Sequence, residues 1–440
     1  MMGSCSRFAL LVATSVLLLG RPASAQNLGD GSGAGLPSSA ALRATVYGPA
    51  PTDLAPLPAS VPLEEINVRM PWARPVPSVL WFDRRLRAWL SAQPGPAPLV
   101  IVISGIGSGG NSAKQSILRG ALYGAGYHVL TLPSPTAPGF IVSSSSTGVV
   151  GDLTQDGEDL YAAIRHILPL LPARVQITTV DLVGYSLGGA NAAMVKALDT
   201  TAGRDLIRRV VMINPPVSLL ASIRRLDQLF VASIGPRDAD IENLYRRLYA
   251  RLANAYYESG AVQLDEGFLL RAAGDILRTD ADLAAAIALD FRLSLIDLFF
   301  VGDLYAKTGV VVDPQHLQDV ENSLDGIYAI LRTRSYSEYF ARVLAPYYLQ
   351  HRPGSNLEQL AAANDLAVIG EQLRTDSDYY AQTSVDDLIL NDAERAWLQN
   401  TLGSRLAVYS HGGHLGNIGE RRQISDLLAM LAGRWPDHTP

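Results

Sequence analysis

Short, wholly apolar runs alternate with amphipathic helical segments through much of this 440-residue chain. The runs carry apolar residues at consecutive positions, which indicates strands buried on both faces, as in a parallel sheet. A helical pattern follows most of these runs, and this repetition is typical of a doubly wound α/β sheet. The strands are predicted at 98–104, 127–132, 177–184 and 207–213, and the helices at 111–123, 155–171 and 187–199.

The alternation stops after Asn214 and resumes near residue 376. Residues 215–375 carry helical patterns without a convincing strand, so they predict a large all-helical insertion, or cap. We therefore expect one α/β domain in two parts, residues 66–214 and 376–440, on either side of the cap. Helices are predicted in the cap at 240–255, 282–304 and 336–349, and beyond it a strand at 379–385, a helix at 392–402, a strand at 405–410 and a helix at 416–433.

The amino-terminal 25 residues have the pattern of a signal peptide. Arg7 precedes an apolar run over residues 8–20, and Ala23-Ser24-Ala25 offers a small-residue cleavage site. That run of 13 residues is too short to span a bilayer of about 30 Å. We expect an exported bacterial protein, periplasmic or secreted, and no transmembrane segment. The single cysteine, Cys5, lies in this segment, so a disulfide framework or a multi-cysteine metal site is excluded.

Two further segments can be interpreted from composition and spacing. Residues 26–65 are rich in Gly, Pro, Ala and Ser, and we expect a flexible, loosely attached leader there. Residues 78–92 have apolar residues at helical spacing, and we predict a helix. The formal net charge of −6 argues against nucleic acid as a partner.

The segment after the third strand, Gly184-Tyr185-Ser186-Leu187-Gly188, has the pattern G-x-S-x-G. A strand-to-helix turn of this kind is so tight that side chains at the two glycine positions would collide with neighbouring backbone. The serine is forced into a strained conformation with its hydroxyl exposed. The amide dipoles of the following helix favour developing negative charge nearby. Ser186 is therefore the predicted nucleophile.

A serine hydroxyl needs a base to activate it and an acid to orient that base. After the last predicted strand, glycines flank His414, which immediately precedes the closing helix. We favour His414 as the base, with His411 as the fallback. Asp386 and Asp387 follow the strand 379–385, at the sheet edge that Ser186 faces. We favour Asp387 as the acid and keep Asp386 as the alternative.

A glycine-rich loop follows the first predicted strand, at residues 104–110. Its backbone can approach the nucleophile, and the amides of Ile106 and Leu187 are the predicted oxyanion hole. A phosphate-cradling loop is a competing interpretation, but Lys114 is not preceded by glycine or followed by Ser or Thr, as G-x-x-x-x-G-K-[ST] requires.

A dinucleotide site is the other competing interpretation of this loop. Gly105, Gly107 and Gly110 satisfy G-x-G-x-x-G after a strand. Such a site also needs an acidic residue at the end of the next strand, and no Asp or Glu occurs between Ser104 and Asp152. The oxyanion interpretation is therefore preferred.

Together these motifs resemble the α/β-hydrolase superfamily. They are SGIGSGG at 104–110, GYSLGG at 184–189, DDLIL at 386–390 and GGHLGN at 412–417, in the family's chain order. The resemblance covers about residues 98–214 and 376–433 and implies the α/β-hydrolase fold, a Ser186–His414–Asp387 triad and an acyl-enzyme intermediate. The closing GGHLG motif is similar to that of esterases, lipases and acyltransferases. Ser104 stands where many members have His.

The expected function is an exported serine hydrolase that cleaves carboxylic esters, with acyl or lipid esters as the substrate class. The alternatives are an acyltransferase with the same triad and a non-catalytic lipid-binding envelope protein. The sequence implies no cofactor and no metal, and it has no H-E-x-x-H motif. The expected partners are a small-molecule or lipid ester and, peripherally, envelope lipids. Apolar residues 293–300 of the cap fit either an acyl pocket or internal packing.

Overall fold

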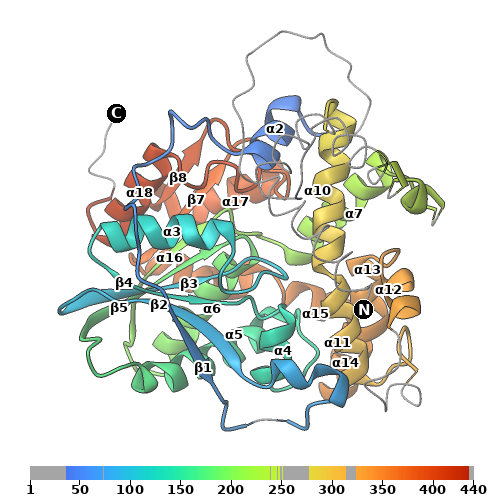
Figure 1. Cartoon of the computed structure of the whole chain (residues 1–440), viewed down its shortest axis with the longest axis horizontal. Coiled ribbons are helices and arrows are strands. Elements are labelled where there is room, and N and C mark those ends of the chain that lie inside the picture. Colours follow the sequence, from blue (N-terminus) through green and yellow to red (C-terminus); the bar gives the residue numbers. More distant parts are fainter. Residues whose placement is uncertain are drawn as a thin grey trace, which may run out of the picture.

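The computed structural model describes residues 36–435, except residues 73, 238, 245, 248, 249, 251–276 and 314–323. The signal segment and much of the predicted helix 240–255 lie outside the described residues. Eight strands form one sheet in the order β1-β2-β4-β3-β5-β6-β7-β8 (Figure 1). The strands are β1 (Glu64–Val68), β2 (Leu86–Ser91), β3 (Ala97–Ile103), β4 (His128–Leu132), β5 (Ile177–Tyr185), β6 (Ile207–Ile213), β7 (Tyr379–Ser384) and β8 (Leu406–Tyr409).

The sheet is parallel from β4 to β8, and β2 runs antiparallel to both of its neighbours. The prediction of a mostly parallel α/β sheet is therefore confirmed. Side chains of β3 explain the wholly apolar runs, because they alternate between two buried clusters. Val100 and Val102 pack with helices α3 (Ala113–Gly124) and α18 (Arg421–Leu431) on one face.

The opposite face of the sheet is covered by α5 (Leu153–Ile167) and α6 (Leu187–Thr201), as Figure 1 shows. Leu99, Ile101 and Ile103 of β3 pack against them. Burial on both faces requires apolar side chains at every position, which is the pattern the sequence carries. Further helical elements in and around the sheet domain include α4 (Pro138–Ser143), α17 (Asp392–Leu402), η2 (Leu168–Leu170) and η5 (Gly403–Arg405).

Between β6 and β7, the described secondary-structure elements are all helices, which agrees with the predicted insertion. Figure 1 shows most of these helices gathered at one side of the sheet. The predicted helix 282–304 is two helices that meet at Leu295, and the predicted helix 336–349 includes a π-helical turn, η3 (Phe340–Leu344). The cap helices are α7 (Leu219–Ser233), α10 (Asp280–Ser294), α11 (Ile296–Ala306), α12 (Asp325–Leu331), α13 (Tyr336–Tyr339), α14 (Ala345–His351), α15 (Leu357–Ala362), η4 (Leu366–Ile369) and α16 (Gly370–Thr375).

The cap and the sheet domain share a buried apolar cluster. Ile141 and Leu187 of the sheet domain pack in it with Leu298, Phe299 and Leu344 of the cap. The cap is therefore packed onto the α/β part through a common core. None of the helices in the described part of the chain is long and apolar enough to cross a membrane.

The prediction of a helix over residues 78–92 is wrong. A short 3₁₀ helix, η1 (Ser78–Asp83), is followed by strand β2. In β2 the side chains of Leu86, Ala88 and Leu90 are buried and alternate with more exposed ones, which is the period of a strand with one buried face. Pairing with β1 and β4 selects that period over the helical spacing that the same residues also satisfy.

The prediction of a loose leader over residues 26–65 does not hold for its later part. Residues Ser39–Tyr47 form helix α2, and β1 begins at Glu64. Between them, Leu54 makes an isolated β-bridge with Glu420. Leu42 and Val46 are buried against the cap, so a few apolar contacts order a segment whose overall composition is typical of a linker.

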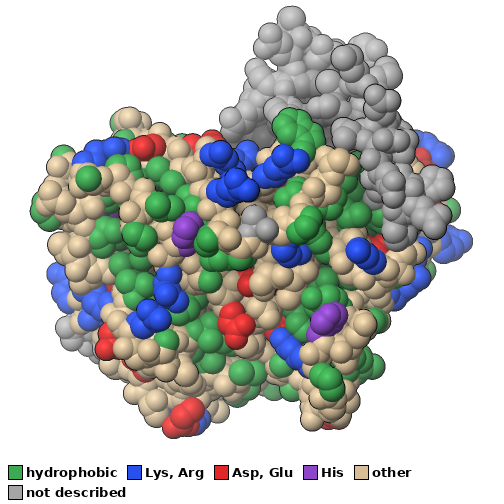
Figure 2. Space-filling model, turned by 90° about the horizontal axis from the view of Figure 1, so that it is seen from below, with side chains coloured by type: hydrophobic (Ala, Val, Ile, Leu, Met, Phe, Trp, Pro, Cys, Tyr) green, Lys and Arg blue, Asp and Glu red, His purple; other side chains and the backbone are tan. Residues whose placement is uncertain are grey.

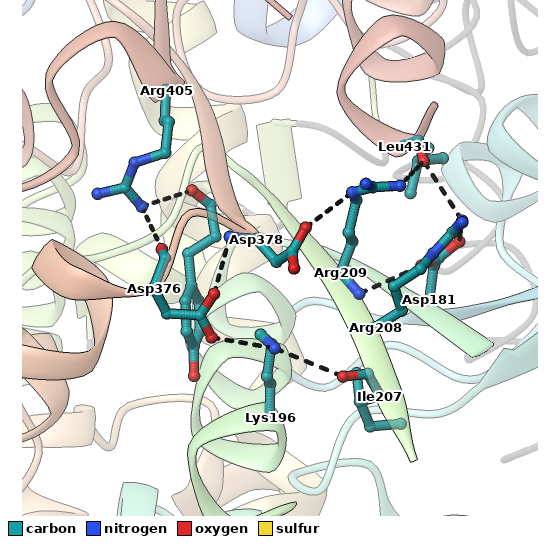
Figure 3. A network of polar contacts seen from close by, with 10 residues as sticks. Asp181, Lys196, Ile207, Arg208, Arg209, Asp376, Asp378, Arg405 and Leu431 are labelled. Atoms are coloured by element: carbon teal, nitrogen blue, oxygen red, sulfur yellow. Dashed lines mark hydrogen bonds and ion pairs between the residues drawn. The ribbon is translucent and has the colours of Figure 1, made fainter. Parts of the chain in front are cut away.

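A polar network fixes the amino-terminal end of β6, where that strand enters the sheet (Figure 3). The buried carboxylate of Asp181 accepts two hydrogen bonds from the Arg208 guanidinium, at 2.8 and 2.5 Å. Arg209 bonds Asp378 at 2.8 Å, and both arginines donate to the carbonyl of Leu431 at the end of α18. The network therefore holds β6 to its neighbours at this end of the sheet.

Candidate active site

Ser186 lies at the turn between β5 and α6 with φ 53° and ψ −130°. A positive φ is strained for a residue with a side chain and persists only where the surroundings enforce it. A Cβ on Gly184 would lie 2.0 Å from the carbonyl oxygen of Gly188. A Cβ on Gly188 would lie 2.3 Å from the carbonyl oxygen of Ile103. Both glycines are therefore required for the turn, for the steric reason expected from the motif.

The three residues predicted as nucleophile, base and acid lie together. His414 Nε2 is 3.0 Å from Ser186 Oγ, and His414 Nδ1 is 2.9 Å from Asp387 Oδ1. Asp387 is buried, whereas Ser186 and His414 are half-buried. His411 is exposed, and none of the described hydrogen bonds joins it to this group. The arrangement is a continuous hydrogen-bonded chain from a hydroxyl through an imidazole to a carboxylate.

The two neighbouring aspartates have different partners. Asp387 accepts the backbone N–H of Ile389 at 3.1 Å and the Asn214 side-chain amide at 2.7 Å, in addition to the imidazole. Asp386 accepts the backbone N–H of Gly413 at 2.9 Å. The geometry therefore places Asp387 on the imidazole and Asp386 on the backbone of the loop that carries it.

Asn214 is a site residue that the sequence analysis missed. Its φ is 48°, a left-handed conformation that Asn tolerates better than most residues. It lies at the end of β6, and its backbone N–H bonds the carbonyl of Gln382 on β7 at 2.7 Å. A polar residue between an apolar strand and Pro215 was the available signal, but nothing local shows which carboxylate it reaches.

The glycine-rich loop after β3 lies directly against the nucleophile. A Cβ on Gly105 would lie 3.2 Å from Cβ of Ser186. Leu187 N belongs to the first turn of α6, where backbone N–H groups have no acceptor within the helix. Among the described residues, neither the Ile106 nor the Leu187 amide donates to a protein acceptor. Both predicted oxyanion donors therefore remain available.

The side chains of Ser104, Thr136 and Tyr185 hold this loop in shape. Ser104 Oγ donates to the carbonyl of Leu132 at 2.9 Å, and Gly107 N–H donates to Thr136 Oγ1 at 2.8 Å. The hydroxyl of Tyr185 is 3.1 Å from Ser112 Oγ. Ser104, the departure from the family pattern, thus ties the loop to β4. No sequence pattern indicates these roles of Tyr185 and Thr136.

The loop glycines are explained by close packing. A Cβ on Gly107 would lie 2.5 Å from the carbonyl oxygen of Ser294, and one on Gly110 would lie 2.2 Å from the Trp89 ring. The end of α10 therefore rests on the glycine-rich loop. These contacts account for the glycine spacing that also satisfied the dinucleotide pattern.

Apolar cap side chains surround this edge of the sheet. Leu187 is buried in one cluster with Leu219, Leu220 and Leu295, and Ile106 packs against that cluster. Leu295, Leu298, Phe299 and Phe300 are themselves buried there, so internal packing, one of the two roles that the sequence left open for them, is the role seen. In the described part of the chain, no three His, Cys, Asp or Glu side chains lie close enough together to hold a metal ion.

No protein-family model and no curated protein matches the sequence. Solved structures with a similar fold include a putative hydrolase from Legionella pneumophila, at 12% identity and TM-score 0.45, covering 91% of this chain and 95% of that one. The carboxylesterase EstE1, cloned from a metagenomic library, is 14% identical, with TM-score 0.39 and coverage of 90% and 93%. A Pyrococcus furiosus esterase is 11% identical, with TM-score 0.39 and coverage of 85% and 91%.

These values describe a likeness of fold and carry nothing about activity. The sheet order, the single antiparallel strand beside β4 and the elbow after β5 define the α/β-hydrolase fold with a helical insertion. The chain therefore has the α/β-hydrolase fold that its motifs predicted.

Proposed function

We propose that this protein is an exported serine hydrolase that cleaves carboxylic esters, with acyl or lipid esters as its substrates. The observation that carries the proposal is the hydrogen-bonded chain from Ser186 through His414 to Asp387. Its serine is held at positive φ on a tight turn, beside two backbone amides that have no acceptor among the described residues. Export is proposed from the signal-peptide pattern of residues 1–25.

The proposed reaction follows from these atoms. His414 Nε2 accepts the hydroxyl proton as Ser186 Oγ attacks the ester carbonyl carbon. Asp387 holds Nδ1–H and stabilises the imidazolium that forms. The amides of Ile106 and Leu187 stabilise the oxyanion of the tetrahedral intermediate. The imidazolium then protonates the departing alkoxide, which leaves an acyl-enzyme. Water, deprotonated by His414, releases the carboxylic acid and restores the serine.

The surroundings of the site favour an apolar acyl group. The residues next to the two amides are Leu and Ile side chains that pack with the cap. On the face shown in Figure 2, basic, acidic and apolar side chains are interspersed, without a continuous basic surface for a polyanion. The formal net charge of −6 also argues against a polyanionic substrate. We therefore propose an uncharged ester with a hydrocarbon acyl chain.

Replacement of the nucleophile tests the proposal. Ser186→Ala should abolish covalent labelling by a fluorophosphonate probe and reduce hydrolysis of p-nitrophenyl esters by about 10⁶-fold, because no acyl-enzyme can form. The exposed Ser60 offers a matched control, and Ser60→Ala should keep both activities. Labelling that persists in Ser186→Ala would disprove the assignment of the nucleophile.

Two further measurements test the type of reaction and the proposed export. A new ester formed when an alcohol is added would show acyl transfer in place of hydrolysis. The protein recovered from the periplasm or medium of expressing bacteria should begin at Gln26, as its intact mass would show. A mass that includes residues 1–25 would contradict the proposed export by cleavage.

A further inference from the structure

Helix α2 lies between the cap and the loop that carries His414. Its apolar side chains Leu42 and Val46 are buried against α7 and α10 of the cap. Ser39 Oγ donates to Asp280 at the start of α10, at 2.8 Å. Figure 1 shows α2 beside α10, far in sequence from that helix. The cap therefore sets the place of α2.

The opposite side of α2 contacts the backbone of the histidine loop. Thr45 Oγ1 accepts the backbone N–H of His414 at 3.0 Å and donates to the carbonyl of Ala41 at 2.7 Å. Because the hydroxyl proton is directed to Ala41, an oxygen lone pair is free to accept from His414. The threonine thus bonds the residue proposed as the catalytic base through its main chain.

The fit between α2 and this loop is too close for side chains on the loop. A Cβ on Gly413 would lie 2.3 Å from Thr45 Oγ1, and one on Gly416 would lie 2.0 Å from the carbonyl oxygen of Ala44. Gly413 also has φ +52°, which disfavours other residues. Both glycines beside His414 are therefore explained by the approach of α2.

Two consecutive backbone amides of the loop are held from opposite parts of the chain. Gly413 N–H donates to Asp386 after β7, and His414 N–H donates to Thr45 of α2. The imidazole is then oriented at Nδ1 by Asp387. With its backbone fixed at two points, His414 can keep Nε2 at hydrogen-bond distance from Ser186.

We propose that Thr45 is a positioning residue for the catalytic histidine. It touches neither substrate nor the reacting atoms, and it acts by fixing the backbone from which the imidazole projects. The inference rests on the proposed role of His414 as general base. A displacement of about 1 Å at a reacting group can cost about 100-fold in rate, so loss of this contact should be seen in kcat.

Thr45→Val tests the inference, because valine has nearly the same shape and cannot accept the His414 N–H. We expect kcat for a p-nitrophenyl ester and the rate of fluorophosphonate labelling to fall together by about 10- to 100-fold. KM should stay unchanged, since substrate does not contact Thr45. Thr45→Ser restores the acceptor and should restore kcat to within about threefold. Thr375→Val is the matched control, at an exposed threonine at the end of α16 whose hydroxyl likewise donates to a carbonyl four residues earlier, that of Glu371.

Thr45→Ala provides a second variant if valine disturbs packing, because alanine favours the helix and adds no bulk. It should show the same kcat loss with an unchanged circular dichroism spectrum. Wild-type kcat in either folded variant, or an equal loss in Thr45→Ser, would overturn the inference while leaving Ser186 labelling intact. Absence of Ser186 labelling in the wild type would instead overturn the proposed function.

Discussion

At the scale of single residues, the two adjacent carboxylates that follow β7 have different environments and different hydrogen-bond partners. Asp387 is buried and bonds the imidazole, while Asp386 is half-buried and bonds a backbone amide. In the proposed reaction the imidazolium needs a charged partner at Nδ1, but a backbone N–H needs only an oxygen acceptor. The two positions should therefore respond differently to the loss of charge.

Asn substitutions should separate the two aspartates. Asp387→Asn should lower kcat by about 10³- to 10⁴-fold, because the amide neither stabilises the imidazolium nor fixes the correct tautomer. Asp386→Asn should lower kcat by less than about tenfold, since its amide oxygen can still accept the Gly413 N–H. Steady-state hydrolysis of a p-nitrophenyl ester, with Tm as the folding control, measures both. A greater loss in Asp386→Asn would reverse the assignment.

The site residues that could be predicted from the sequence are those whose neighbours in the chain indicate their role. Ser186 stands in a local motif, and His414 and Asp387 follow predicted strands, so their positions at one sheet edge could be inferred from topology. Asn214 and Thr45 could not be inferred in this way. Each has its site contact with a partner far along the chain, 173 positions away for Asn214 and 369 for Thr45. No spacing rule predicts which distant backbone a hydroxyl or amide meets.

At the scale of elements, the amino-terminal end of α5 concentrates buried charge. Asp152 caps the helix through Gln155 N–H at 2.9 Å, and Arg352 bonds both oxygens of its carboxylate, at 2.7 and 3.0 Å. Asp156, one turn along, accepts the Gly151 N–H at 2.8 Å and is likewise buried. Burial raises the pKa of Asp156 well above its ordinary value, and the charges of Asp152 and Asp159 raise it further.

This pKa shift predicts a pH-dependent difference between the protein and its Asp156→Asn variant. The folded state binds a proton that the unfolded state has released above pH 3.8, so stability falls as pH rises through the window up to the folded pKa. The slope is at most about 1.4 kcal/mol per pH unit for one group. The variant lacks this loss and should gain stability relative to the wild type as pH rises. Urea unfolding of both proteins from pH 4 to 8 measures this difference. A difference in the free energy of unfolding that stays constant over this range would contradict the prediction.

The strands that could be predicted from the sequence are those that are buried on both faces of the sheet. Runs buried on both faces, such as β3 and β6, have no competing helical interpretation of similar length, and all six predicted strands are present. Strand β2 is close to the sheet edge, and its one-sided pattern also fits a helix. Helix α2 is short and set in linker-like composition, and only its contacts with the cap and the histidine loop give it a fixed place.

At the scale of the whole molecule, the chain offers separate optical signals for its two parts. The five tryptophans all lie outside residues 215–375, whereas most described residues of that insertion are helical. Tryptophan fluorescence therefore reports the α/β part, and far-ultraviolet circular dichroism carries a large contribution from the cap. The shared cluster of Ile141, Leu187, Leu298 and Phe299 argues that neither part keeps its core without the other.

The two signals should therefore change together on unfolding in urea, with one midpoint. Leu298→Ala, at a fully buried side chain of the shared cluster, should lower stability by about 3 kcal/mol and move both transitions equally. Ile330→Ala, at a side chain that is 44% exposed on α12, is the matched control and should move neither by more than about 0.5 kcal/mol. If Leu298→Ala shifted the dichroism transition alone, the cap would be an independently folding unit resting on a self-sufficient sheet. Coincident shifts would instead make the cap part of the structure that holds Leu187, and with it the proposed oxyanion donor, in place.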